Sequence, residues 1–176
     1  MKSSGHKRER WLGVTLLATA ALLADAAAAQ ARFGWLGLPP ASIGQTVAQA
    51  ETSLKAPLLA APGQADAPCQ KRSTAAQPGV VYVVDDGLIT RVETRDKRYP
   101  SISGVRVGDD AHKARQVYGA RLSVQPHLYF DNGLRLSVYS PDRQYALVME
   151  SNDNGRIIAM RAGMVPAVEQ LEGCSR

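Results

Sequence analysis

Short alternating runs separated by turn residues constrain the second half of this 176-residue chain more than any other feature. Leu134, Leu136 and Val138 alternate with polar or aromatic residues, which predicts a strand with one buried and one exposed face. The Asn132-Gly133 pair in front of this run is a strong β-hairpin signal. We therefore predict an antiparallel meander of strands at residues 127–130, 134–140, 145–151 and 156–162.

The first half of the chain has fewer strand signals and one long loop. Apolar runs at residues 80–84 and 88–94 flank the turn residues Asp85-Asp86-Gly87, which predicts a second hairpin. The Pro- and Gly-containing stretch at residues 59–79 predicts a long loop, with one further strand around Cys69.

Each half also contains the pattern of one short amphipathic helix. Thr46 and Gln49 fit a capping box at the start of the first helix. Asp109 or Asp110 can cap the second helix, and Gly119 suits its C-terminal end. Helices of about ten residues are marginal alone, so both are expected to pack on the predicted strands.

The two helix starts align with each other. Residues 43–58 match residues 107–122 without gaps, and Gly44 aligns with Gly108. We therefore predict an α+β fold of two tandem repeats, each a short helical segment followed by an antiparallel β-meander. The predicted segments after residue 31 are a first repeat, a linker, a second repeat and a C-terminal tail, at residues 32–96, 97–103, 104–162 and 163–176.

The first helix start resembles a signature of small bacterial envelope domains. Gly44-Gln45-Thr46, with Gln49, Leu54 and Pro57 after it, is similar to the helix start of SmpA/OmlA-type lipoproteins and of β-lactamase inhibitory protein repeats. Gln49 stands where those families usually have Glu. A tandem arrangement without a lipid anchor favours the inhibitory-protein side. The resemblance implies a protein that binds another protein across a concave sheet, without catalysis; an outer-membrane assembly accessory is the alternative.

The first 31 residues have the features of a secretory signal peptide. Four basic residues precede an apolar run from Trp11 to Ala24, and Ala-x-Ala sites end at Ala29 and Ala31. The apolar run is shorter than the about 20 residues that span a bilayer, and no cysteine lies nearby to carry a lipid. We predict a signal peptide at residues 1–31 and a periplasmic or secreted mature protein, for which membrane association is not implied. An uncleaved N-terminal anchor is the alternative.

Export changes what the charge and the cysteines imply. The whole chain has a net charge of +5, but without residues 1–31 it has seventeen Lys and Arg against fourteen Asp and Glu, or +3. These bases are scattered and no recognition motif accompanies them, so we predict no nucleic-acid partner. The two cysteines, Cys69 and Cys174, predict a disulfide bond in an oxidising compartment; two separate thiols are the alternative.

Catalytic and metal-binding patterns are weak throughout the mature chain. The segment from Glu150 to Gly155 resembles the start of a calcium loop, but its twelfth position is Arg161, so we predict an ordinary turn and no metal site. No glycine spacing suits a phosphate, and we predict no cofactor. His127 or His112 could serve a small secreted hydrolase, but no serine has the strained Gly-x-Ser-x-Gly setting. We expect no enzyme activity.

Tyrosines and arginines in the predicted strands are the best candidates for contact with a partner, because these residue types dominate the energetics of protein interfaces. The candidate sheet-face residues are Tyr82, Arg91, Tyr129, Arg135, Tyr139 and Arg161. We therefore expect an exported, non-catalytic protein-binding module, an inhibitor of or accessory to another envelope or secreted protein whose identity the sequence leaves open.

Overall fold

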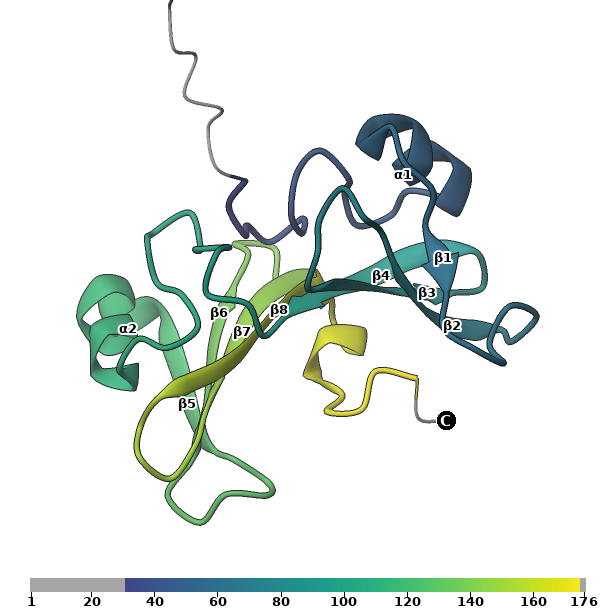
Figure 1. Ribbon diagram of the computed structural model, residues 1–176. Helices are drawn as coiled ribbons and strands as arrows, with labels where there is room; N and C mark the ends of the chain where they lie inside the picture. Colours follow the sequence, from purple (N-terminus) through teal and green to yellow (C-terminus); the bar gives the residue numbers. More distant parts are fainter. Residues whose placement is uncertain (1–30, 175–176) are drawn as a thin grey trace, which may run out of the picture.

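The structure, a computed structural model, describes residues 31–174, and nearly all of the predicted signal peptide lies outside this range. Eight antiparallel strands form one sheet, in the order β1-β2-β3-β4-β8-β7-β6-β5 (Figure 1). The strands are β1 (Leu59–Ala60), β2 (Cys69–Ser73), β3 (Val80–Asp85), β4 (Leu88–Thr94), β5 (Leu122–Pro126), β6 (Leu134–Tyr139), β7 (Tyr145–Ser151) and β8 (Ile157–Met164). Two α-helices, α1 (Val47–Leu54) and α2 (Ala111–Tyr118), and two 3-10 turns, η1 (Gly119–Arg121) and η2 (Ala167–Glu169), complete the elements.

Both helices begin where their capping residues predict. The Thr46 side chain accepts from the backbone N–H of Gln49, and the Gln49 side chain accepts from the backbone N–H of Thr46, so the capping box is confirmed. For α2, Asp110 is the cap, accepting from the His112 backbone N–H at 2.8 Å. Gly119 follows α2 with a φ of 53°, a conformation that glycine adopts without strain.

Most strands also lie where the alternation and the turn residues predict, with two exceptions. The two-residue strand β1 lies in the predicted loop at residues 59–79. Residues 127–130 do not form a strand, and the strand of this hairpin is β5 instead. The reason is the loop after β5: the His127 N–H donates to the Gly133 carbonyl at 2.9 Å, and the Gly133 N–H donates to the Phe130 carbonyl. A Cβ at position 133 would lie 2.6 Å from the Ser151 carbonyl, so this tight loop requires glycine there.

The predicted α+β fold of two tandem helix-plus-meander repeats is wrong. The two helices have only eight residues each, and the molecule is mainly one eight-stranded sheet. The sheet is continuous because β4 pairs with β8, with Arg91 opposite Gly163 and Thr94 opposite Met160. A Cβ at position 163 would lie 2.5 Å from the Thr90 carbonyl, so glycine allows this close approach of the two strands.

The likeness of the two helix starts has a local explanation within this sheet. The Gly44 N–H donates to the Ile89 carbonyl, and the Gly108 N–H donates to the Ile157 carbonyl, both at 2.8 Å. Each helix start is therefore fixed to the beginning of one of the two central strands, β4 or β8. The sequence similarity reflects one kind of helix-to-strand junction used twice in a single sheet.

The main core lies between the helices and one face of the sheet, which we call the helix face. Ala50 and Leu54 of α1, with Ala114 and Tyr118 of α2, join strand residues in one buried cluster. The strand residues in this cluster come from β3, β4, β6, β7 and β8: Val80, Tyr82, Val84, Ile89, Val92, Leu136, Val138, Leu147, Met149, Ile157, Met160 and Ala162. The sheet thus has one continuous apolar face.

Two short strands form the edges of the sheet. β1 has two residues, and β5 ends at Pro126. Within residues 31–174, no helix is long and apolar enough to cross a membrane.

Candidate functional site

The C-terminal segment crosses the sheet face opposite the helices. We call residues 165–174 the strap and this face the strap face; the strap is the yellow segment beneath β4 and β8 in Figure 1. Val168 in η2 has no exposed surface and packs in a small second cluster with Ala146 and Val148 of β7. The apolar side chain of Val168 therefore anchors the strap on the sheet.

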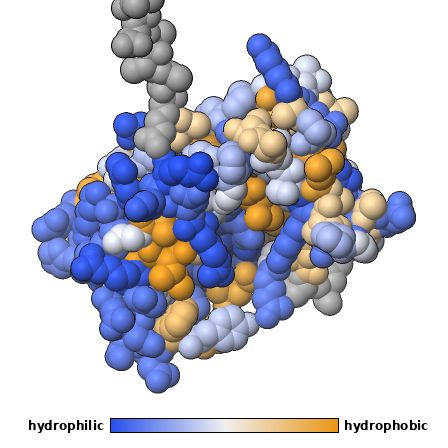
Figure 2. All heavy atoms as spheres, in the orientation of Figure 1, coloured by the Kyte–Doolittle hydropathy of each residue, from blue (hydrophilic) through white to orange (hydrophobic). Residues whose placement is uncertain are grey.

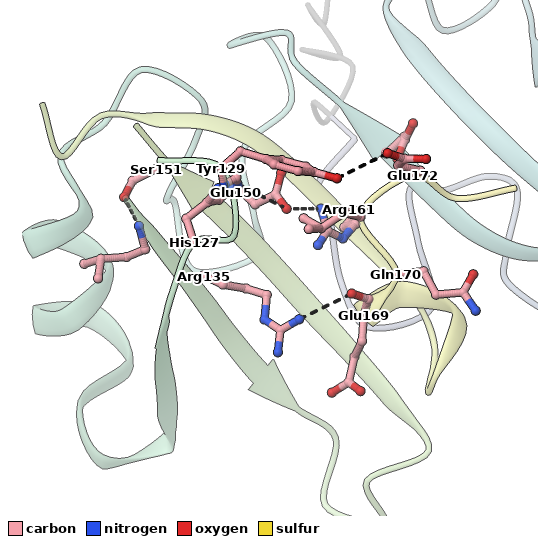
Figure 3. A network of polar contacts seen from close by, with 12 residues as sticks. His127, Tyr129, Arg135, Glu150, Ser151, Arg161, Glu169, Gln170 and Glu172 are labelled. Atoms are coloured by element: carbon pink, nitrogen blue, oxygen red, sulfur yellow. Dashed lines mark hydrogen bonds and ion pairs between the residues drawn. The ribbon is translucent and has the colours of Figure 1, made fainter. Parts of the chain in front are cut away.

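Three arginines of the strap face hold successive carbonyls of the strap. The Arg161 Nε donates to the Val168 carbonyl at 2.6 Å, and the Arg135 Nη1 donates to the Glu169 carbonyl at 3.3 Å. Arg91 donates to the Gln170 carbonyl. Figure 3 shows the side chains of Arg135 and Arg161 reaching from the strands toward the strap. The strap, which contains η2 and the bends after it, is thus bound through its backbone carbonyls.

Two of these arginines are buried ion-pair partners. The Arg161 Nη1 lies 2.5 Å from the Glu150 Oε1, and the side chains are 3% and 8% exposed. Arg91, equally buried, pairs with Glu93 on its own strand. Burial lowers the pKa of the Arg161 guanidinium; Glu150 opposes this shift and nearby Arg91 adds to it. Buried charges of this kind require neighbours that fix their geometry.

Two tyrosines bind the carboxylates of the strap. The Tyr139 hydroxyl donates to the Glu169 Oε1 at 2.5 Å, and the Tyr129 hydroxyl donates to the Glu172 Oε1 at 3.2 Å. Partial burial, with Glu169 beside it, raises the pKa of Tyr139. The bond to Glu172 raises the pKa of Tyr129. The face therefore recognises both the backbone and the acidic side chains of the strap.

The predicted disulfide between Cys69 and Cys174 is confirmed. The bond joins β2 to the end of the strap across 105 positions of sequence, with the two Cα atoms 5.5 Å apart. It fixes the far end of the strap on the sheet, while the chain connection to β8 fixes the near end.

The strap divides its face into two hollows, and Leu171 lines both. The larger, which we call the groove, has a volume of about 750 Å³ over β2, β3, β4 and β8. Its charged lining residues are Lys71, Arg91, Glu93, Arg95, Arg161 and Glu172. The smaller hollow, of about 480 Å³, lies beside β5 and includes His127, Leu128 and Arg135. Figure 2 shows that hydrophilic side chains cover much of the molecule in this view, with apolar residues in small patches between them.

Of the six predicted sheet-face residues, the structure brings five together. Arg91, Arg135, Tyr139 and Arg161 lie on the strap face, and Tyr129 stands in the loop at its rim. Tyr82 does not join them.

Tyr82 lies on the helix face with no exposed surface, and its hydroxyl donates to the Gln77 side chain. The alternation of β3 explains this position, since Tyr82 shares a face with the core residues Val80 and Val84. Burial raises the pKa of the Tyr82 hydroxyl strongly.

Sequence reasoning missed the acidic partners of this network. Within β7, Glu150 follows the apolar run Ala146-Leu147-Val148-Met149, and a single acid after such a run could have indicated a buried ion pair. The strap residues Val168, Glu169 and Glu172 gave no comparable signal, because their contacts lie far away in sequence.

The contacts of His127 lie within the fold and involve a neighbouring backbone N–H and a buried carboxylate. The His127 Nδ1 accepts from the Tyr129 backbone N–H at 3.0 Å, and its Nε2 lies 3.7 Å from the Glu150 Oε1. Among residues 31–174, neither His127 nor His112 has a hydrogen bond to a hydroxyl or thiol. Over the same range, no three His, Cys, Asp or Glu side chains gather as metal ligands. The predicted turn at residues 152–155 is confirmed, since the Asn152 Oδ1 accepts from two backbone N–H groups across it.

Comparison with known proteins identifies no family. No family model matches the chain, and no curated protein matches it. A solved structure of an extracellular protein containing a SCP domain from Bacillus anthracis str. Ames matches with 6% sequence identity and a TM-score of 0.45. The match covers 70% of this chain and 44% of that chain, so this chain spans less than half of the solved one. A likeness this distant carries no argument about function.

Proposed function

We propose that this chain is an exported, non-catalytic module that binds another protein through its strap face. Its role there is that of an inhibitor of, or an accessory to, another envelope or secreted protein. The residues of this face that stay accessible beside the strap support the proposal: Tyr129 is exposed and Arg135 is partly exposed, and arginine and tyrosine are residue types that dominate interface energetics. The resemblance of the first helix start to inhibitory and assembly proteins of the bacterial envelope points in the same direction.

One observation carries the proposal. Leu128 and Tyr129 are 74% and 63% exposed and stand side by side in the loop after β5. Leu128 lines the smaller hollow and Tyr129 lines the groove, so the pair stands between the two. Large apolar side chains exposed together beside concave, polar surface are typical of a contact site for another protein.

The disulfide supports export. Bonds of this kind persist in oxidising compartments and are rare in the cytosol. Together with the basic and apolar N-terminal pattern, the Cys69–Cys174 bond supports a periplasmic or secreted location.

Affinity capture with paired variants tests the proposal. The mature protein, the Leu128→Ala/Tyr129→Ala variant and a control variant are immobilised and exposed to periplasmic extract and culture medium. The control is Leu36→Ala/Ile102→Ala, because these residues are 53% and 62% exposed and line neither hollow. Quantitative mass spectrometry then compares the captured proteins.

We expect one protein to be enriched by wild type and control and depleted at least about tenfold by the Leu128/Tyr129 variant, as truncation of interface anchors predicts. The candidate partner is then purified and its Kd for all three proteins measured. Equal capture by all three would contradict the proposal. Turnover on a hydrolase panel that is lost in His127→Ala would instead favour the small secreted hydrolase.

A further inference from the structure

The groove beside the strap has the chemistry of a carboxylate site. We infer that it binds an acidic segment of the partner protein, whose Asp or Glu side chains contact Arg161, Lys71 and Arg95. This inference rests on the proposed function and names the kind of segment that the strap face recognises.

The first support is an unused donor on Arg161. Its Nε and Nη1 bind the Val168 carbonyl and Glu150, but its Nη2 has no hydrogen-bond partner among residues 31–174. The Arg161 side chain is 3% exposed and lines the groove. A buried, unpaired N–H of a charged group is costly, and a carboxylate oxygen is the acceptor that satisfies it best.

The second support is the charge of the groove. Four basic residues line it against two acidic ones, Glu93 and Glu172. Glu93 is already bound to Arg91, and Glu172 to Tyr129. Lys71 and Arg95 form no ion pair with any residue in the range 31–174, so their charge is available on the wall of the groove. A concave surface with this surplus attracts anionic groups.

The third support is the strap itself, which shows what this face can hold. The strap has a 3-10 helix, η2, followed by bends, and carries acids at positions 169 and 172; arginines bind its carbonyls and tyrosines bind its carboxylates. A partner segment of the same chemistry would lie alongside it, with its carboxylates turned toward Lys71 on β2 and Arg95 after β4. The strap then forms one wall of the binding site.

Fluorescence anisotropy with a labelled hexaglutamate peptide tests the site on the whole disulfide-bonded mature protein. Hexaglutamine and hexalysine peptides are the ligand controls. The test variant is Lys71→Ala/Arg95→Ala, and the matched control is Arg115→Ala/Arg121→Ala, which removes two exposed bases from α2 and η1, away from the groove. Both variants lower the net charge equally, so only the position of the lost charges differs.

We expect hexaglutamate to bind about fivefold more weakly to Lys71→Ala/Arg95→Ala and within about 1.5-fold of wild type to the control, at low salt. Equal loss in both variants would show general charge attraction and overturn the inference. Hexaglutamine binding as tightly as hexaglutamate would overturn it as well.

Side-chain NMR reports on Arg161 without replacing it. With ¹⁵N-labelled arginine, hexaglutamate should shift the Arg161 guanidinium resonances and leave those of Arg115 and Arg121 in place. Unmoved Arg161 resonances at saturating peptide would exclude it from the site. The Arg161→Lys variant, if folded by circular dichroism, keeps the charge but loses the planar group, and should weaken binding about threefold.

These results separate the inference from the proposed function. If protein capture depends on Leu128 and Tyr129 while hexaglutamate does not bind in the groove, only the inference of a carboxylate site is wrong. If hexaglutamate binds in the groove and no protein is captured, the site stands and the protein-binding role falls.

Discussion

The two faces of this sheet are held together by different physics. The helix face is a continuous apolar layer in which Leu136, Met149 and Ile157 have almost no exposed surface. The strap face has one small apolar cluster at Val168 and otherwise depends on the Cys69–Cys174 disulfide, hydrogen bonds and ion pairs. Apolar burial is strong but tolerant of rearrangement, whereas a network of charges fixes individual atoms. The comparison therefore distinguishes a helix face stabilised by apolar burial from a strap face stabilised by a covalent bond and by polar contacts of fixed geometry.

Removal of the disulfide should have the largest effect, and it should begin on the strap face. A bond that closes a loop of 105 positions restricts the unfolded chain, so Cys69→Ala/Cys174→Ala should lower the free energy of unfolding by about 4.5 kcal/mol, measured by urea titration. Hydrogen exchange under native conditions should show loss of protection in the strap before the helix face. Simultaneous loss of protection in the strap and on the helix face would contradict the idea that the two faces are stabilised in different ways.

Breaking one buried ion pair should come next. Glu150→Gln leaves the charge of Arg161 buried without its partner and should cost about 4 kcal/mol of unfolding free energy. Glu150→Gln/Arg161→Met removes both charges and should recover most of that loss, because a buried pair adds little net stability over an apolar one. If the double variant is no more stable than the single one, the network contributes stability in its own right.

A cavity on the helix face should have a slightly smaller effect. Leu136→Ala removes a fully buried side chain from the main cluster and should cost about 3 kcal/mol in the same urea titration. Val148→Ala on the strap face is compared with Val138→Ala on the helix face, since both remove the same two carbons from a buried valine; Val148→Ala should cost less because its cluster is small. A larger loss for Val148 than for Val138 would contradict the assignment of the main apolar packing to the helix face.

The smallest predicted effect is a change in the free energy of unfolding at alkaline pH, and it should differ between Tyr82 and Tyr139. An unfolded tyrosine ionises at about pH 10, whereas burial holds the pKa of Tyr82 far above that value. The unfolded state therefore loses its proton first, and stability falls as the pH rises beyond about 10.

Tyr82→Phe should cost about 1 kcal/mol at neutral pH, since it loses one hydrogen bond. It should also reduce the decline at high pH. Tyr139→Phe, on the more open strap face, should reduce that decline less; urea titrations at several pH values compare the two. A larger change for Tyr139 would contradict the burial assigned to Tyr82.

Local features of the fold could be predicted from the sequence because their causes are local. Thr46 with Gln49 and Asp110 fix the helix starts through bonds to residues two or three positions away. Asn132-Gly133 marks a turn for the same reason. The pairing of β4 with β8 has no such local cause, since it joins residues about seventy positions apart through a close approach at Gly163. The tandem-repeat prediction failed at that pairing.

The candidate site shows the same division. Residue type alone indicated Arg91, Arg135 and Arg161, and the structure places all three on one face. What they bind depends on the path of the strap, which returns across the sheet from β8. Tyr82 was grouped with them because alternation assigns a residue to one of two faces without saying which face is covered.

The edges of the sheet decide from which direction a partner strand could approach. β1 offers only two residues for pairing, and β5 ends in a proline that lacks an N–H. Neither edge presents the long row of free backbone groups that strand addition and fibre growth require. The molecule is therefore protected against sheet-to-sheet aggregation at both ends, and β-augmentation is poorly supported as a way for another chain to join it.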